Sequence, residues 1–206
     1  MIVNYVENPT PHLLLKNVFD TEELKLVHTE LDFLHSMLNN PEDTGGSTSA
    51  FGENRKQNKG MFLDQVYVQP KHSFIWNFFQ KKIYTPDTCQ HWPHLWQKNL
   101  YTLITWSHYL VSYYEDNGYY LKHNDASIFS TLIWVWKEPK QFEGGDFIFS
   151  DKSHTIKVEN NTGIIFFGAE PHEITAIKEK DCLPKTFGRW SIGGFSGLEV
   201  VAGGSK

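Results

Sequence analysis

The sequence predicts an all-β core of the sandwich or jelly-roll type, with helices packed on the outside of one sheet. From residue 101 onward, about eight apolar or β-branched segments follow one another at spacings of roughly 8–12 residues, separated by turn residues. Aromatic residues make up 15% of the chain, which suits a β-rich interior or a pocket lined by flat side chains. The 206 residues fit a single domain, in which residues 1–100 support a core formed by residues 101–197.

The supporting half begins with a predicted strand and helix. Residues 12–19 are mostly apolar and predict a short strand. A helix then begins at Asp20 or Thr21, because either residue can cap it and two glutamates follow in its first turn. The helix is expected to end near residues 39–40. Its apolar face repeats at helical spacing through Leu24, Val27, Leu31, Leu34 and Leu38.

The stretch between this helix and the β core is less regular. Residues 41–60 are polar and rich in Gly and Asn, and they fit either a long surface loop or a mobile lid that substrate orders over a site. Residues 61–68 predict a strand, and residues 72–84 have the pattern of a second helix. Residues 89–106 fit a helix or a strand, and the near-helical spacing of their Trp and Leu residues favours a helix to about residue 100.

The second half of the chain is predicted to be strand after strand with short connections. A turn is expected at residues 115–118, and the pair Gly144-Gly145 marks another break. Residues 128–136 are almost continuously apolar or β-branched, as in a central strand. The predicted strands are 108–114, 119–123, 128–136, 146–149, 155–158, 163–167, 173–178 and 189–195.

Composition argues against several classes of protein. The net charge of -5 and the absence of a Lys/Arg block disfavour general nucleic-acid binding. Cys89 and Cys182 belong to no CxxC pair, so neither a disulfide framework nor a Cys-based zinc site is expected. The N-terminus lacks the features of a signal peptide, and no apolar run approaches the ~18 residues of a membrane span. We therefore expect a cytoplasmic protein with neither a membrane nor a nucleic-acid partner.

One triplet in the β region has the composition of a metal site. His123 and Asp125 are two residues apart, so on an extended strand their side chains point to the same face. With a second His from a later strand they would form a 2-His-1-carboxylate triad, which leaves three coordination positions open. His172 follows the apolar run 163–167 and is the favoured second His, whereas the rival His154 lies in an apparent exposed hairpin turn. The alternative is a surface His beside a turn Asp.

A second set of residues points to an anionic ligand. Arg189 and Ser191 share one face of the last predicted strand, with Trp190 on the other. If the shared face is the interior, the guanidinium needs an anion, and a dicarboxylate held bidentately by Arg189, with a further hydrogen bond from Ser191, would serve. Tyr114 lies on the strand before the His123 hairpin, where its phenol could contact the same carboxylate. The alternatives are an outward-facing Arg189 and a Tyr114 that belongs to the core.

Taken in chain order, these residues resemble the iron(II)/2-oxoglutarate-dependent dioxygenases, and most closely their prolyl 4-hydroxylase-like branch. The resemblance covers about residues 108–196 and, more faintly, residues 18–38. It implies a double-stranded β-helix, the jelly-roll or cupin-like fold, with Fe(II) bound by His123, Asp125 and His172. It also implies that 2-oxoglutarate chelates the metal and is held by Arg189, with Ser191 and Tyr114 beside it. The motifs that carry it are Tyr114, His123-Asn124-Asp125, Glu143-Gly144-Gly145-Asp146-Phe147, residues 163–167, His172 and Arg189-Trp190-Ser191.

The resemblance further implies an activity. Members of the family use O2 to decarboxylate 2-oxoglutarate to succinate and CO2 while they hydroxylate an unactivated C–H bond, and ascorbate is a candidate reductant. Asp125 favours hydroxylation, because related halogenases lack this carboxylate. A peptidyl proline is the favoured substrate, and a free amino acid or another small molecule is the alternative. On the residues alone, a non-enzymatic jelly-roll binding module with structural His123 and His172 stays open.

The chain departs from the family pattern in two places. The interval from His172 to Arg189 is longer than usual in this branch, so Lys185 is a second candidate anchor for 2-oxoglutarate. Trp134 and Trp136 stand where relatives tend to place Tyr and Asn. Both departures concern the pocket of the cosubstrate and leave the metal ligands unchanged.

Overall fold

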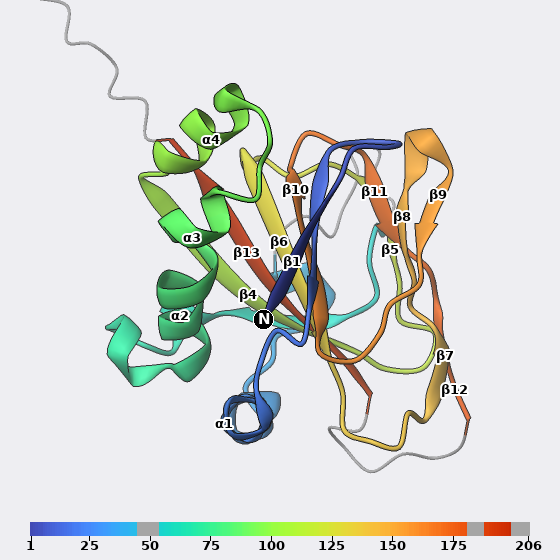
Figure 1. Ribbon diagram of the computed structural model, residues 1–206. Helices are drawn as coiled ribbons and strands as arrows, with labels where there is room; N and C mark the ends of the chain where they lie inside the picture. Colours follow the sequence, from blue (N-terminus) through green and yellow to red (C-terminus); the bar gives the residue numbers. More distant parts are fainter. Residues whose placement is uncertain (45–53, 181–187, 199–206) are drawn as a thin grey trace, which may run out of the picture.

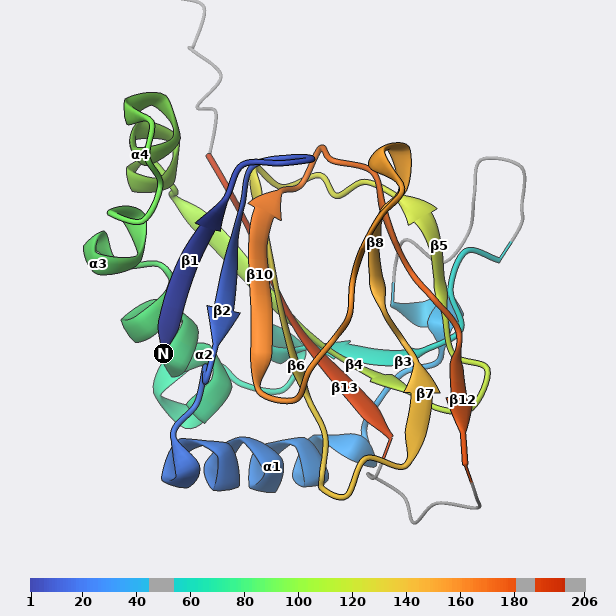
Figure 2. The ribbon, with the colours of Figure 1, turned by 45° about the vertical axis from the view of Figure 1, so that its right-hand side comes forward.

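Two antiparallel β-sheets face each other, and helices cover the outer side of the larger sheet (Figure 1, Figure 2). The computed structural model describes residues 1–44, 54–180 and 188–198. Within these residues the larger sheet has seven strands, in the order β1 (Ile2–Val6), β2 (His12–Lys16), β10 (Thr162–Phe167), β6 (Phe129–Val135), β13 (Arg189–Gly197), β4 (Trp106–Tyr114) and β3 (Lys59–Phe62). The smaller sheet has four, in the order β5 (Tyr120–His123), β11 (His172–Ile174), β8 (Phe147–Phe149) and β9 (His154–Ile156). A separate pair joins β12 (Ile177–Glu179) to β7 (Phe142–Gly144).

The central strand β6 shows how the larger sheet separates two cores. Its Phe129 and Ile133 belong to the hydrophobic cluster beneath the helices. Its Trp134 belongs to a second cluster between the two sheets, which contains Phe147 and Phe149 from β8. Because side chains alternate along a strand, one apolar segment supplies both cores. The aromatic content of the chain is concentrated in these two layers, so the expected all-β core with flanking helices is confirmed.

Helix α1 (Thr21–His35) packs on the outer side of the larger sheet, and its first turn is fixed by a capping box. The Asp20 carboxylate accepts hydrogen bonds from the backbone N–H groups of Glu22 and Glu23 at 3.0 and 2.9 Å, and Glu23 accepts one from the Asp20 N–H at 3.0 Å. The predicted apolar face is buried through Val27, Leu31 and Leu34. The helix ends at His35 rather than near residues 39–40, and a short 3-10 helix, Pro41–Asp43, follows.

The other predicted helices are shorter than expected. Residues 72–84 form α2 (Phe74–Phe78) and then a π-helical turn, Phe79–Ile83. Residues 89–106 do not form one helix, because Pro93 separates α3 (Pro86–Cys89) from α4 (Leu95–Thr102). The remaining 3-10 helices are Leu63–Gln65, Pro70–His72 and Ser150–Lys152. Over the described ranges, no helix combines the length and apolarity needed to cross a membrane.

Several strands differ from the prediction, and β7 was not predicted at all, because only a break at Gly144-Gly145 was expected there. β1 was not expected, and it pairs with β2 at the edge of the larger sheet. The predicted strand 61–68 is the shorter β3, because the chain leaves the sheet at the 3-10 turn after Phe62, and Val68 is 91% exposed. The predicted strand 173–178 is divided between β11 and β12, which pair with different partners.

Candidate metal centre and its cavity

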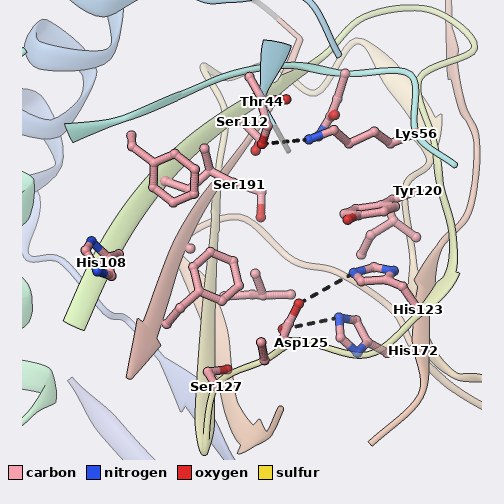
Figure 3. A pocket seen from close by; sticks show the side chains of 18 of the residues that line it. Thr44, Lys56, His108, Ser112, Tyr120, His123, Asp125, Ser127, His172 and Ser191 are labelled. Atoms are coloured by element: carbon pink, nitrogen blue, oxygen red, sulfur yellow. Dashed lines mark hydrogen bonds and ion pairs between the residues drawn. The ribbon is translucent and has the colours of Figure 1, made fainter. Parts of the chain in front are cut away.

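The three predicted metal ligands come together on the smaller sheet. His123 is the last residue of β5 and His172 the first of β11, and the two residues are directly paired in the antiparallel ladder. Asp125 follows β5 by two residues. Its carboxylate oxygens lie 3.8 Å from His123 Nε2 and 3.7 Å from His172 Nε2, as the dashed lines in Figure 3 mark. One ligand atom from each residue lies within 4.8 Å of the others.

Both imidazoles are oriented by the same local contact. His123 Nδ1 donates to the carbonyl of Leu121 at 2.8 Å, and His172 Nδ1 donates to the carbonyl of Glu170 at 2.9 Å. A carbonyl oxygen only accepts, so Nδ1 carries the proton and the lone pair of Nε2 is left for a metal. Burial and the neighbouring His172 lower the pKa of His123 to about 3, which keeps this imidazole neutral.

Asp125 is held by one hydroxyl group, which a second hydroxyl contacts in turn, and by a backbone hydrogen bond. Ser130 Oγ donates to Asp125 Oδ2 at 2.5 Å, and Ser127 Oγ lies 2.7 Å from Ser130 Oγ. The Asp125 N–H donates to the carbonyl of Gly168 at 2.8 Å. Burial raises the pKa of Asp125. A cation beside this carboxylate would favour its charged form, and two imidazoles with one carboxylate are a donor set that suits Fe(II) with three positions left open.

Replacing Ser130 with alanine should weaken Fe(II) binding about 10- to 100-fold, the usual effect of removing an outer-shell partner. The Ser130 hydroxyl fixes the rotamer of the liganding carboxylate, and alanine leaves Asp125 Oδ2 without that donor. Anaerobic calorimetric titration with Fe(II) measures the change. Ser196→Ala is the matched control, because its buried hydroxyl donates to the Phe129 carbonyl and contacts no metal ligand. Equal affinity in Ser130→Ala and the wild type would show that the carboxylate is positioned by other contacts.

The cluster opens into a cavity of about 830 Å³ between the two sheets. From β4 the cavity is lined by Ser112 and Tyr114, and from β13 by Ser191, while Lys56 contributes from the segment before β3. Figure 3 shows Lys56 and Tyr120 on the same wall as His123. The volume is within the range of small-molecule sites.

Arg189 is fully buried and lacks hydrogen-bond partners for its guanidinium. It is 0% exposed, and none of Nε, Nη1 and Nη2 has an acceptor in the described part of the chain. Its Cζ lies 4.8 Å from the ring centroid of Tyr114 and 6.0 Å from that of Trp134, whose Nε1 is also buried without an acceptor. Burial lowers the pKa of Arg189 to about 10, so the group stays charged at neutral pH. Four donor nitrogens thus meet in one interior region, and no described residue supplies an acceptor for them.

Arg189 does not itself line the cavity, whereas Tyr114 and Ser191 do. It lies behind Tyr114, on the face of β13 opposite Trp190, which packs against α1 through His35 at a ring-centroid distance of 5.8 Å. The alternative of an outward-facing Arg189 is therefore excluded.

Of the remaining candidate residues, one lies away from the metal-ligand cluster and others lie outside the described residues. His154 opens the edge strand β9 and is not part of the metal-ligand cluster. Lys185 lies outside the described residues, and so does the central part of the 41–60 segment, residues 45–53. Lys56 and Ser130 were not singled out beforehand. Ser130 carries a faint signal, a polar residue in an otherwise apolar predicted strand, whereas Lys56 lies in the polar run 55–59 and carries none.

Comparisons with known proteins identify the fold. No family model and no curated protein matches the chain. Among solved structures, a prolyl-4-hydroxylase of Pseudomonas putida superposes with a TM-score of 0.59 at 13% identity, covering 91% of this chain and 92% of that one. A viral collagen prolyl hydroxylase from Paramecium Bursaria Chlorella virus-1, in a 2-oxoglutarate complex, gives 0.54 at 13%, covering 90% and 94%. An oxidoreductase of the 2OG-Fe(II) oxygenase family from Burkholderia pseudomallei gives 0.59 at 16%, covering 90% and 84%. The chain has the double-stranded β-helix fold of these proteins, as predicted.

Proposed function

We propose that the chain is an Fe(II)- and 2-oxoglutarate-dependent dioxygenase that hydroxylates an unactivated C–H bond. The observation that carries the proposal is the cluster of His123, Asp125 and His172 at the wall of a cavity. Each imidazole presents Nε2 because its Nδ1 is engaged, and the carboxylate is oriented by Ser130. This is the ligand set that non-haem Fe(II) oxygenases use.

The unsatisfied donors near Tyr114 support 2-oxoglutarate as the cosubstrate. A buried guanidinium without an acceptor is unfavourable, and a carboxylate can accept two parallel hydrogen bonds from it. Arg189 would hold the carboxylate remote from the metal, and Tyr114 and Ser191 would contact it from the cavity wall. We propose these three residues as the cosubstrate site, with Lys185 as the second candidate for the cation.

In the proposed reaction a substrate R–H, 2-oxoglutarate and O2 give R–OH, succinate and CO2. Iron bound to His123, Asp125 and His172 would supply the activation of O2. The chain's own contribution is to hold the three ligands on one side, leave three positions open and place the substrate's C–H bond beside them.

A peptidyl proline is the substrate that we propose to test first. Two of the solved structures with the same fold are described as prolyl hydroxylases. Fold alone does not fix a substrate, so a free amino acid or another small molecule is the second candidate. The cavity of about 830 Å³ would accommodate either a small acid or one residue of a peptide with its neighbours.

Succinate formation tests the proposal. The wild-type protein with Fe(II), ascorbate and 2-oxoglutarate should produce succinate, and more of it with one member of a panel of proline-containing peptides and free amino acids. Anaerobic addition of Fe(II) and 2-oxoglutarate should also give a weak visible charge-transfer band. Absence of both the band and succinate would favour a non-enzymatic jelly-roll binding module.

A further inference from the structure

Lys56 is a buried cation in the cavity wall that has no carboxylate partner among the residues that the structure describes. The residue is 5% exposed, and its Nζ donates a hydrogen bond of 3.4 Å to the carbonyl of Thr44. No carboxylate in the described residues lies within ion-pair distance of it. Lys59, three residues later, instead pairs with Glu115 at 2.8 Å. A buried ammonium ion needs a compensating charge, and within residues 1–44, 54–180 and 188–198 no carboxylate supplies it, which leaves Lys56 available for an anionic ligand.

The backbone holds Lys56 firmly beside the strand that carries His123. Gln57 N–H donates to the Tyr119 carbonyl at 2.9 Å, and Leu121 N–H donates to the Arg55 carbonyl at 2.7 Å. Lys56 itself is bridged to Tyr120. The segment therefore lies antiparallel beside β5, and the position of the Lys56 side chain is tied to that of the candidate metal ligand His123.

One aromatic ring separates the Lys56 ammonium group from the candidate metal ligand. Its Nζ lies 5.6 Å from the ring centroid of Tyr120, and that ring stacks on His123 with centroids 3.6 Å apart and planes at 13°. Figure 3 shows Lys56, Tyr120 and His123 in this order along the wall. A ligand group held by Lys56 would thus lie close to the position where the metal acts.

Lys56 and Arg189 are separate cations. Lys56 faces the open cavity, whereas Arg189 lies behind Tyr114 and is fully enclosed. Among the cavity-lining residues that the structure describes, Lys56 is the only Lys or Arg. Asn58, on the same segment, also lines the cavity and has a buried Oδ1 without a donor. The enclosed Arg189 suits the cosubstrate 2-oxoglutarate, whereas the cavity-facing Lys56 suits a substrate, which enters and leaves through the cavity.

We propose that Lys56 binds a carboxylate of the substrate, so that this enzyme hydroxylates a carbon near an acidic group. The inference rests on the proposed function and narrows its substrate class. A single ammonium group matches the single charge of a carboxylate, whereas a phosphate would call for several donors. Leu110, Leu132 and Phe195 line the same cavity and provide contact for an apolar substrate body. The carboxylate could belong to a free amino acid or to a peptide.

Matched acids and amides test the proposal together with two variants. The panel contains free amino acids and their amides, and proline-containing peptides with Glu or Gln beside the proline. Acids should support at least about 10-fold more succinate than their amides, and Lys56→Met should raise the KM for the acid about 10- to 100-fold while leaving the KM for 2-oxoglutarate unchanged. Lys59→Met, which removes a cation of the same segment, should behave as the wild type. A preference for free acids or for Glu-containing peptides identifies the source of the carboxylate.

A binding measurement separates this proposal from the proposed activity. Protein loaded with Zn(II) and saturated with 2-oxoglutarate should show a rise in melting temperature with the acids that is absent with the amides and lost in Lys56→Met. If the wild type makes no succinate but shows this Lys56-dependent rise, the oxygenase proposal fails and the carboxylate site stands. Equal responses to acids and amides in both measurements would overturn the inference. The inference would also be overturned if Lys56→Met changed the KM for 2-oxoglutarate and left the KM for the acid unchanged.

Discussion

Replacing His123 or His172 with alanine should abolish Fe(II) binding and, with it, all 2-oxoglutarate-dependent succinate formation. The three ligand atoms lie within 4.8 Å of one another, and each variant leaves a site of two ligands. The loss of affinity should exceed the roughly 10- to 100-fold that outer-shell substitutions cause. Anaerobic titration with Fe(II), followed by the succinate assay, measures both effects. Asp125→Ala should lose Fe(II) affinity in the same way, since it removes the charged ligand.

His154→Ala is the matched control for these variants. His154 lies on β9, in the same sheet as His123 and His172, but it is outside the metal-ligand cluster. It should therefore keep the Fe(II) affinity and succinate formation of the wild type. If His123→Ala instead bound Fe(II) as tightly as the wild type, the imidazoles would be structural and the chain would be better described as a jelly-roll binding module.

The half of the candidate metal centre that is local in sequence was the easier half to predict. The spacing of His123 and Asp125 gives them one face of an extended segment, whatever the rest of the chain does. Placing His172 opposite His123 requires the register between β5 and β11, which sequence spacing does not fix. The position of His172 after the apolar run 163–167 made it the favoured second His, and the resemblance in motif order agreed with that choice, but neither gave the register.

Features that depend on distant pairing escaped prediction. Lys56 is part of a polar run that has the composition of a surface loop, yet hydrogen bonds to β5 place its side chain inside the cavity. The edge strand β1 was not predicted either, and it is a strand because it pairs with β2. In both cases the residue types permit several conformations, and the partner across the sheet selects one.

Replacing Arg189 with methionine should weaken 2-oxoglutarate binding while making the ligand-free protein more stable. The guanidinium has no acceptor in the described structure, so methionine of similar length removes an uncompensated buried charge and keeps most of the packing. Replacing buried ionic groups with apolar ones typically raises the free energy of unfolding by about 1–4 kcal/mol. Loss of one partner of a buried charged pair costs the complex about 2–5 kcal/mol, which corresponds to at least about a 30-fold loss of 2-oxoglutarate affinity.

A ligand-binding arginine differs from a structural one in the effect of its replacement. Arg189→Met should raise the free energy of unfolding of the ligand-free protein and lower its affinity for 2-oxoglutarate. Urea unfolding of the ligand-free protein and calorimetric titration of the metal-loaded protein with 2-oxoglutarate measure the two effects, and Fe(II) affinity should change little because Arg189 is not among the metal ligands. Lys185→Met serves as the control for the second candidate anchor. If Lys185→Met lost 2-oxoglutarate affinity and Arg189→Met kept it, the anchor would be Lys185. If Arg189→Met were less stable than the wild type and bound 2-oxoglutarate equally well, the guanidinium would be a stabilising part of the core. Only a cation that binds an anionic ligand should both destabilise the ligand-free protein and strengthen ligand binding.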